Sequence, residues 1–438
     1  MCIKRYHWHL DRATVRDETI AIHGGYRGDD TRSVAVPIYQ TVAHDFIDAD
    51  HAAALFDLVT PGFHYNRINN PTVDVLEKRM AALEGGVSAV ALASGMAAVR
   101  YAVRNITAAG SNVVAAPQLY GATYTLFAHV LPEEGVEVRF AVDDEPKSLE
   151  ARIDDATAAV FCESIGNPAG NIVDLPAVCE MAHSHGVPVI VDNTVATPIL
   201  LKPFEHGADV VVHSLTKFVG GHGTTLGGLI VDGGRFPWGE HPRRFPMFSR
   251  PEPAFHGVVY ASDHPDSPYA VRCRTVGLRN GGATLSPFNA FLLLQGLETL
   301  AVRIERHGAN AEAVARWLQK DPRVAWVSWS GFPDHPHHQL AERLCSNRYP
   351  SILTFGVIGG YEAGIRFFNE VKLFKRLVNL GDAKSLVSHP ASTTHRQLTP
   401  EEQGLVGVSP DMIRLSIGIE HIEDLIADLD QALEATLP

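Results

Sequence analysis

Short apolar runs alternate with stretches of helix length between residues 87 and 231, and this alternation restricts the fold more than any other feature of the sequence. The runs that predict strands are residues 87–93, 112–116, 136–141, 158–163, 187–191, 208–212 and 228–231. Strands that alternate with helices predict an α/β fold, with a mostly parallel sheet that is covered by helices. Ligands of such sheets bind at the carboxyl ends of the strands, so we expect the functional site at that edge.

The alternation ends after residue 231, and the rest of the chain predicts a second unit. Residues 235–267 are rich in proline, histidine and aromatic residues and predict a long ordered loop. Residues 285–320 predict a helix that joins the two units, because their apolar residues share one face. Beyond it we expect strands at 352–357 and 412–419, a helix across 361–380 and a last helix from Ile422, which together predict a smaller α+β domain.

We therefore divide the chain into three parts. Residues 1–64 form an N-terminal segment, of which residues 1–16 show no periodicity and predict a loosely held arm. Residues 65–285 form the large domain that contains the predicted sheet. Residues 286–438 form the linking helix and the C-terminal α+β domain.

The composition excludes several classes of protein. With 45% hydrophobic and 20% charged residues, the 438-residue chain is typical of a soluble globular protein. The net charge of −13 disfavours a surface for nucleic acid or for an anionic membrane. Five scattered cysteines without a CxxC pair disfavour both a disulfide framework and a thiolate zinc site. No apolar run is long enough for a signal peptide or a membrane span, so we expect a cytoplasmic protein.

The histidines at residues 335, 337 and 338 are the one cluster that suggests a metal. Their spacing matches no familiar set of metal ligands, so we interpret residues 334–338 as a solvated loop and expect no metal site.

A single lysine follows one of the predicted strands. The apolar run that ends at Val212 leads into His213, Ser214 and Thr216, and then Lys217 comes before a glycine-rich loop. A lysine surrounded by small residues at a strand end is a candidate for an amine whose pKa falls far enough for it to form a Schiff base. A surface lysine on a loop is the alternative that this segment alone leaves open.

One other strand end, together with the end that precedes the lysine, predicts an anion site beside it. Ser94, Gly95 and Met96 stand between a predicted strand and a predicted helix, where free N–H groups bind anions. Hydroxyl groups of Ser214 and Thr216 lie at the second strand end, and together the two segments could hold one phosphate. Tight packing is the alternative for each segment alone.

Three further side chains can each be interpreted in two ways, as structural residues or as residues with a chemical role. Asp192 ends a predicted strand and either caps the next turn or pairs with a protonated pyridine nitrogen. Tyr120 is either an ordinary half-buried tyrosine or a ring that stacks on that pyridine. Arg414 lies among apolar neighbours and requires a carboxylate, either from the protein or from a substrate.

Eight motifs in one order resemble a known family. The chain resembles the Cys/Met-metabolism group of enzymes that use pyridoxal 5′-phosphate (PLP) and have fold type I, and it is similar to their O-acetylhomoserine sulfhydrylase branch. The motifs are YNRINNPT (65–72), ASGMAA (93–98), LYGAT (119–123), ESIGNP (163–168), VDNT (191–194), HSLTKFVGGHG (213–223), GDAKSLVSHPASTTH (381–395) and RLSIGIEH (414–421).

The resemblance implies a role for each matching residue. Lys217 is implied to be the Schiff-base lysine that also transfers protons, with help from Tyr120, which stacks on the ring. Asp192 is implied to face the pyridine nitrogen and Asn167 to approach the ring hydroxyl. The residues implied to hold the phosphate are Gly95, Met96, Ser214 and Thr216.

The same resemblance implies an oligomer and a substrate site. Tyr65 and Arg67 are implied to reach the phosphate of a neighbouring subunit, within a homotetramer that is a dimer of dimers. Arg414 and the region of Ser385 are implied to bind the α-carboxylate of the substrate.

The implied reaction is γ-replacement. An O-acylated homoserine, with O-acetyl-L-homoserine expected, would react with sulfide or a thiol to give homocysteine or methionine plus acetate. The alternatives are γ-elimination by a lyase, γ-replacement with another nucleophile such as cysteine or a carbanion, and a PLP-free scaffold or binding protein. Asn66 and Ala122 depart from the common family pattern near the site, and Ala122 disfavours a methionine γ-lyase.

Overall fold

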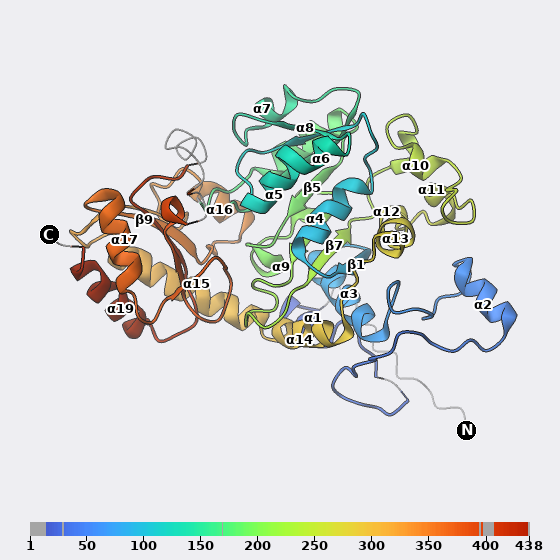
Figure 1. The fold of residues 1–438 in the computed structure, drawn as a ribbon, viewed down its shortest axis with the longest axis horizontal. Coiled ribbons are helices and arrows are strands. Elements are labelled where there is room, and N and C mark those ends of the chain that lie inside the picture. Colours follow the sequence, from blue (N-terminus) through green and yellow to red (C-terminus); the bar gives the residue numbers. More distant parts are fainter. Residues whose placement is uncertain (1–14, 29, 169, 394–395, 397–406, 437–438) are drawn as a thin grey trace.

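The computed structural model describes residues 15–28, 30–168, 170–393, 396 and 407–436 (Figure 1). The predicted arm at residues 1–16 lies outside these ranges except for its last two residues, and so do the last two residues of the 381–395 motif. We retain the division of the chain after residues 64 and 285 as a proposal.

Seven strands form the large sheet in the order β1-β7-β6-β5-β4-β2-β3. They are β1 (Ser88–Leu92), β2 (Asn112–Ala115), β3 (Glu137–Phe140), β4 (Thr157–Glu163), β5 (Val189–Asp192), β6 (Val210–Ser214) and β7 (Gly228–Asp232). Every strand predicted between residues 87 and 231 is present. The prediction of a mostly parallel sheet is confirmed, because only β7 runs antiparallel to its two neighbours.

Both faces of this sheet are apolar, because successive side chains of a strand point to opposite faces. Val189 and Val191 of β5 belong to one buried cluster, whereas Ile190 between them belongs to the other. Helix α4 (Gly95–Arg104) contributes to the second cluster, and α3 (Pro71–Glu84) and α8 (Leu175–Ser184) contribute to the first. Burial on both faces explains why the central strands β5 and β6 are runs of valine and isoleucine.

Helix α3 shows how local sequence sets the ends of an element. The side chain of Asn70 accepts hydrogen bonds from the N–H groups of Thr72 and Val73, and Pro71 occupies the first turn. The helix ends at Gly85, which adopts a positive φ of 95°.

The shorter helices of this part of the chain are α1 (Asp17–His23), α2 (Ala49–Phe56), α5 (Gly121–Thr125), α6 (Leu131–Glu133), α7 (Pro146–Glu150), α9 (Thr197–Leu200), α10 (Pro246–Ser249), α11 (Tyr260–Asp263), α12 (Pro268–Arg272) and α13 (Arg279–Gly281).

A second sheet of five strands forms the C-terminal part, in the order β10-β11-β12-β9-β8. The strands are β8 (Val324–Ser328), β9 (Ile352–Val357), β10 (Lys375–Arg376), β11 (Leu386–Ser388) and β12 (Met412–Ser416). The second sheet shares one apolar core with helices α15 (Leu300–Leu318), α17 (Gly360–Glu370) and α19 (Ile422–Glu434). Helix α16 (His338–Leu344) contributes instead to the same buried cluster as α8. This arrangement is the smaller α+β unit expected from the sequence.

Two helix predictions need correction. The helix predicted at 361–380 ends at Glu370, because the carboxylate of Asp428 accepts the N–H groups of Lys372, Leu373 and Phe374 and draws them out of a helical path. The helix predicted at 285–320 is two helices, α14 (Pro287–Glu298) and α15, which Thr299 separates with φ −106° and ψ 6°.

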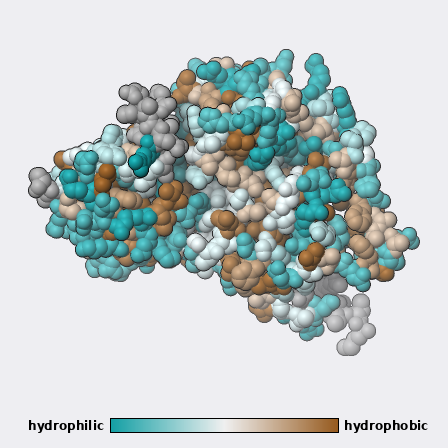
Figure 2. All heavy atoms as spheres, viewed as in Figure 1, coloured by the Kyte–Doolittle hydropathy of each residue, from teal (hydrophilic) through white to brown (hydrophobic). Residues whose placement is uncertain are grey.

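The described part of the chain contains no helix that combines the length and the apolar character needed to cross a membrane. The face drawn in Figure 2 mixes hydrophilic and hydrophobic residues, and the surface over the C-terminal unit, at the left of the view, is mostly hydrophilic.

Candidate active site

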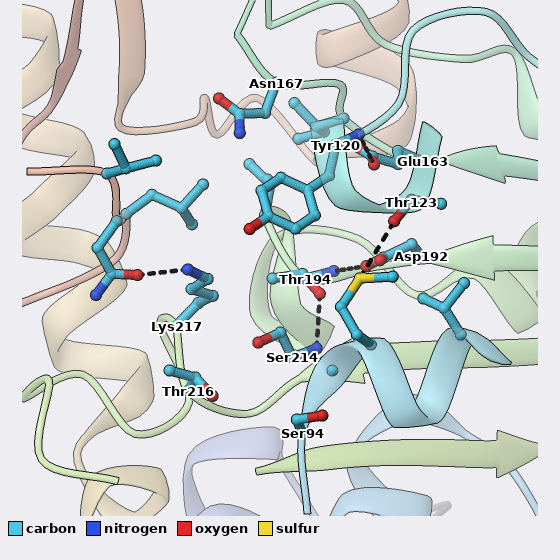
Figure 3. A pocket seen from close by; sticks show the side chains of 18 of the residues that line it. Ser94, Tyr120, Thr123, Glu163, Asn167, Asp192, Thr194, Ser214, Thr216 and Lys217 are labelled. Atoms are coloured by element: carbon cyan, nitrogen blue, oxygen red, sulfur yellow. Dashed lines mark hydrogen bonds between the residues drawn. The ribbon is translucent and has the colours of Figure 1, made fainter. Parts of the chain in front are cut away.

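A cavity of about 190 Å³ opens at the carboxyl ends of β4, β5 and β6, where the two sheets meet (Figure 3). Residues that lie far apart in the chain share its wall. The lining consists of Ser94, Gly95, Met96, Val99, Tyr120, Thr123, Glu163, Ile165, Asn167, Asp192, Thr194, Val195, Ser214, Thr216, Lys217, Leu226, Val378, Asn379, Leu380 and Arg414. This is the edge of the sheet at which the sequence predicts the functional site.

Lys217 points into the cavity from the turn that follows β6. Its Nζ donates a hydrogen bond to Asn379 Oδ1 over 2.5 Å. The pKa of Lys217 is lowered to about 8, first by burial and then by the positive charge of Arg414, while the negative charge of Asp192 opposes both. Roughly a tenth of this amine is therefore uncharged at pH 7, far more than for an ordinary lysine, as a nucleophilic lysine requires.

Asp192 ends β5 at the floor of the cavity. The N–H of Thr194 donates to Asp192 Oδ1 over 3.0 Å, and the same threonine accepts the N–H of Ser214 through its hydroxyl. Burial raises the pKa of Asp192, while the bonds from Thr194 and the charges of His213 and Lys217 lower it. A carboxylate fixed at this depth can pair with a cationic ring nitrogen above it.

The opposite side of the floor is a cradle of backbone and hydroxyl groups. Helix α4 begins at Gly95, so the N–H groups of Gly95 and Met96 have no acceptor within the helix. A Cβ at residue 95 would lie 2.6 Å from the Cβ of Ser214, so only glycine allows the two segments to approach so closely. The donor set of Gly95, Met96, Ser214 and Thr216 fits a phosphate group.

Tyr120 and Asn167 form the upper wall. The backbone N–H of Tyr120 donates to Glu163 Oε1 over 2.5 Å, which fixes the start of α5 above Asp192 (Figure 3). Asn167 Oδ1 accepts a hydrogen bond from Arg414 Nη1 over 2.9 Å. Tyr120 and Asn167 both line the cavity into which Lys217 points.

Arg414 approaches the cavity from β12 of the small sheet. Its Nη2 donates to the carbonyl oxygen of Asn379 over 2.8 Å, and its Nε is buried without a hydrogen-bond partner among the described residues. Burial lowers the pKa of this guanidinium to about 10. A buried cation whose hydrogen-bond acceptors are all neutral fits an anionic group of a substrate.

Three residues predicted for the site stand apart from this lining. Tyr65 and Arg67 pack on each other, with the guanidinium carbon 5.2 Å from the ring centre, and Arg67 donates to the carbonyl of Arg279. The hydroxyl of Ser385 donates to Glu420 Oε2 over 2.9 Å and accepts the N–H of Gly418, so this side chain is fully engaged. The roles predicted for these residues stay predictions, as do those of the residues that line the cavity.

Asn379 and Thr194 contact the central residues of the site, yet sequence analysis assigned neither of them a role. Thr194 lies within the VDNT motif, which could have indicated it. Asn379 lies in a segment predicted to be helical, 162 residues from its partner Lys217, so no local pattern pointed to it.

Comparisons with known proteins agree with this geometry. The sequence profile of a family described as Cys/Met metabolism PLP-dependent enzyme matches residues 18–434. The homocysteine synthase of Schizosaccharomyces pombe is 49% identical over 419 residues, which cover 95% of this chain and 98% of that protein. O-acetyl-L-homoserine sulfhydrylase 1 of Thermus thermophilus is 49% identical over 422 residues, which cover 96% of this chain and 100% of that protein.

A solved structure is similar over nearly the whole chain. The putative O-acetylhomoserine (thiol)-lyase of Campylobacter jejuni, which carries N′-pyridoxyl-lysine-5′-monophosphate, superposes with a TM-score of 0.92 at 44% identity. The match covers 96% of this chain and 100% of that chain.

Proposed function

Because the chain belongs to the Cys/Met metabolism family of PLP-dependent enzymes, we propose that it catalyses γ-replacement on O-acetyl-L-homoserine, with sulfide as the nucleophile. The products are L-homocysteine and acetate. The observation that carries the proposal is the meeting of Lys217, Asp192 and Arg414 around one cavity, in a chain whose relatives include a homocysteine synthase and O-acetyl-L-homoserine sulfhydrylases.

PLP is the cofactor. When bound, it supplies an aldehyde that links to an amine and a ring that accepts the electron pair left at the substrate Cα. Lys217 Nζ would link to the aldehyde, and Asp192 would hold the positive ring nitrogen, since both side chains line the cavity. Gly95, Met96, Ser214 and Thr216 supply the donors for the phosphate.

The residues of the chain divide the work of the reaction. Lys217 Nζ, once free, removes the proton from Cα and returns protons later in the cycle, because its pKa of about 8 allows it to hold or release a proton near neutral pH. Tyr120 covers the ring and assists proton transfer. Arg414 binds the α-carboxylate and so orients the Cα–H bond toward the lysine.

The charges in the cavity favour an uncharged acyl group on the donor. Among the described residues that line it, the lysine and arginine side chains are Lys217 and Arg414. The first links to the cofactor and the second binds the α-carboxylate, so no lysine or arginine of this lining remains for a succinyl carboxylate or a phosphoryl group. Apolar side chains fill much of the remaining wall, among them Val99, Ile165, Leu226, Val378 and Leu380.

We infer that the active unit is at least a dimer and that the assembly is a homotetramer built from two dimers. Tyr65 and Arg67 lie outside the cavity of their own chain, at the end of a segment with strongly exposed apolar residues. Val34 is 97% exposed and Ile47 82% exposed, which supports a protein interface along this segment. A cytoplasmic location accords with the proposed place in sulfur amino acid metabolism.

The direct test is a comparison of donors and nucleophiles in steady state. O-acetylhomoserine with sulfide is expected to yield homocysteine, and O-succinyl- and O-phosphohomoserine are expected to react at least roughly tenfold more slowly in kcat/KM. Ammonia and a 2-oxo acid formed at the same rate without sulfide would instead identify a γ-lyase and overturn the proposal. A higher rate with cysteine or a carbon nucleophile than with sulfide would overturn the choice of nucleophile.

A further inference from the structure

Two carboxyl groups lie side by side under the cavity, and the proposed reaction uses one of them. Glu163 ends β4 and Asp192 ends β5, and the two residues are register partners in the parallel ladder. Partners in such a ladder point to the same face of the sheet, and Figure 3 shows both side chains at adjacent strand ends. Glu163 is only 5% exposed.

The positive charges near this pair act on Asp192. Lys217 and His213, from the turn after β6 and from β6 itself, both stabilise the ionised form of Asp192. Arg414, from β12, faces Lys217 and Tyr120. Among the described residues, the charged group that affects the Glu163 carboxyl is Asp192, which has the same sign. Burial and Asp192 raise the pKa of Glu163, and the backbone hydrogen bonds from Tyr120 and Asn167 lower it by less.

The hydrogen bonds of Glu163 connect two parts of the cavity wall. The N–H of Tyr120 donates to Glu163 Oε1, and the N–H of Asn167 also donates to this carboxyl group. The Glu163 side chain therefore fixes the backbone of two residues. They are Tyr120, which we propose stacks on the cofactor ring, and Asn167, which we propose approaches the ring hydroxyl group.

We propose that Glu163 is a positioning residue that stays protonated, fixes the backbone of Tyr120 and Asn167 through its carboxyl oxygens, and leaves Asp192 as the single negative charge of the pair. Two adjacent carboxyl groups removed from water cannot both ionise readily, so one keeps its proton. The positive charge of Lys217 favours Asp192 as the ionised member. The inference rests on the proposed cofactor site, because it assigns the ring nitrogen one anionic neighbour rather than two.

The protonation state can be read by infrared spectroscopy on the full-length protein with its cofactor and without substrate. The difference spectrum between wild type and Glu163→Gln at about pH 8 is expected to show the loss of a C=O band of a protonated carboxyl group, since an ordinary glutamate is ionised there. Loss of a carboxylate band instead would overturn the proposal. Neither substrate nor sulfide is present, so a failure of the proposed reaction does not affect this result.

Asp232 offers a matched control. It ends β7, is 1% exposed and accepts the N–H groups of Gly234 and Ala270, but it does not line the cavity. Burial raises its pKa to about 6. Asp232→Asn is therefore expected to lose a protonated-carboxyl band at about pH 5 and a carboxylate band at about pH 8, which also shows that a single carboxyl group can be detected.

Kinetic measurements on two variants distinguish the role of the hydrogen bonds of Glu163 from the role of its charge. Glu163→Gln keeps an oxygen for the N–H of Tyr120, whereas Glu163→Ala removes it. We expect kcat to fall roughly 100-fold or more in the alanine variant and less than roughly tenfold in the glutamine variant, because small displacements of groups at a reacting centre have effects of this size. Equal losses in both variants would mean that Glu163 acts through a negative charge and would overturn the proposal.

Discussion

Lys217 Nζ donates a hydrogen bond to Asn379 Oδ1, and this bond joins the turn after β6 in the large sheet to the segment between β10 and β11 in the small sheet. The carbonyl of the same Asn379 accepts a hydrogen bond from Arg414. One residue thus places the amine proposed for the cofactor and the guanidinium proposed for the substrate.

A negative charge at residue 379 should change the pH dependence of cofactor attachment. The Lys217 amine must be unprotonated to attack an aldehyde, and its pKa is about 8, so the rate at which PLP attaches to the cofactor-free protein should rise with pH up to about 8 and then level off. Asn379→Asp places a carboxylate beside the ammonium form and favours it. The pH at which the attachment rate levels off should therefore rise by roughly one unit, and stopped-flow absorbance can measure this shift.

Asn369→Asp is the control for that variant, because Asn369 lies on α17 and is exposed. Its profile should match that of the wild type. An unshifted profile in Asn379→Asp would contradict the contact between Asn379 and Lys217.

Arg414→Lys should weaken binding of the substrate more than it slows turnover. Arg414 reaches Asn167 and Asn379 with separate nitrogens of one planar group, which a lysine ammonium cannot reproduce. We expect KM for O-acetylhomoserine to rise roughly 10- to 100-fold, with a smaller change in kcat. Arg376→Lys, at an exposed position on β10 of the same sheet, should leave both constants unchanged. An unaltered KM in Arg414→Lys would contradict the proposal that Arg414 binds the substrate.

Much of the site follows from local patterns in the sequence. An apolar run that ends in polar residues predicts both a strand and its carboxyl end, and Asp192, Ser214 and Lys217 all stand at such ends. The central strands of the large sheet were predictable for the same reason, because both of its faces are buried there and β5 and β6 are apolar up to their last residues.

The parts that sequence analysis missed depend on contacts between distant segments. The segment after Glu370 has the apolar residues of a helix, yet Asp428, more than 50 residues further on, accepts its N–H groups and ends the helix. That change brings Asn379 to the cavity. The Ser385 hydroxyl likewise donates to Glu420, which lies 35 residues further along the chain.

Arg303 should contribute strongly to stability. It is 4% exposed, and its guanidinium donates to the carbonyl oxygens of Phe218, Val219 and Gly296, with Phe218 following Lys217 directly. Arg303→Met removes the donor from the buried carbonyl oxygens of Phe218 and Val219, whereas Gly296 keeps its bonds from Thr299, and should lower the free energy of unfolding by about 3 kcal/mol, as urea unfolding can measure.

Arg316→Met supplies the comparison on the same helix, α15. Arg316 is 53% exposed, and its ion-pair partner among the described residues is Glu312 one turn away, so its replacement should change stability by less than about 0.5 kcal/mol. A similar loss of unfolding free energy in the two variants would contradict a large contribution of the buried Arg303 hydrogen bonds to stability.

The central claim is that the Lys217 amine links to PLP and moves the substrate proton, and homocysteine formation by Lys217→Ala tests it most directly. With O-acetylhomoserine and sulfide at saturation, kcat should fall by at least roughly 10³-fold, because both nucleophile and proton carrier are lost. Lys320→Ala, at an exposed position after α15, should retain the wild-type rate. A Lys217→Ala protein that keeps more than about a tenth of the wild-type kcat would contradict the account.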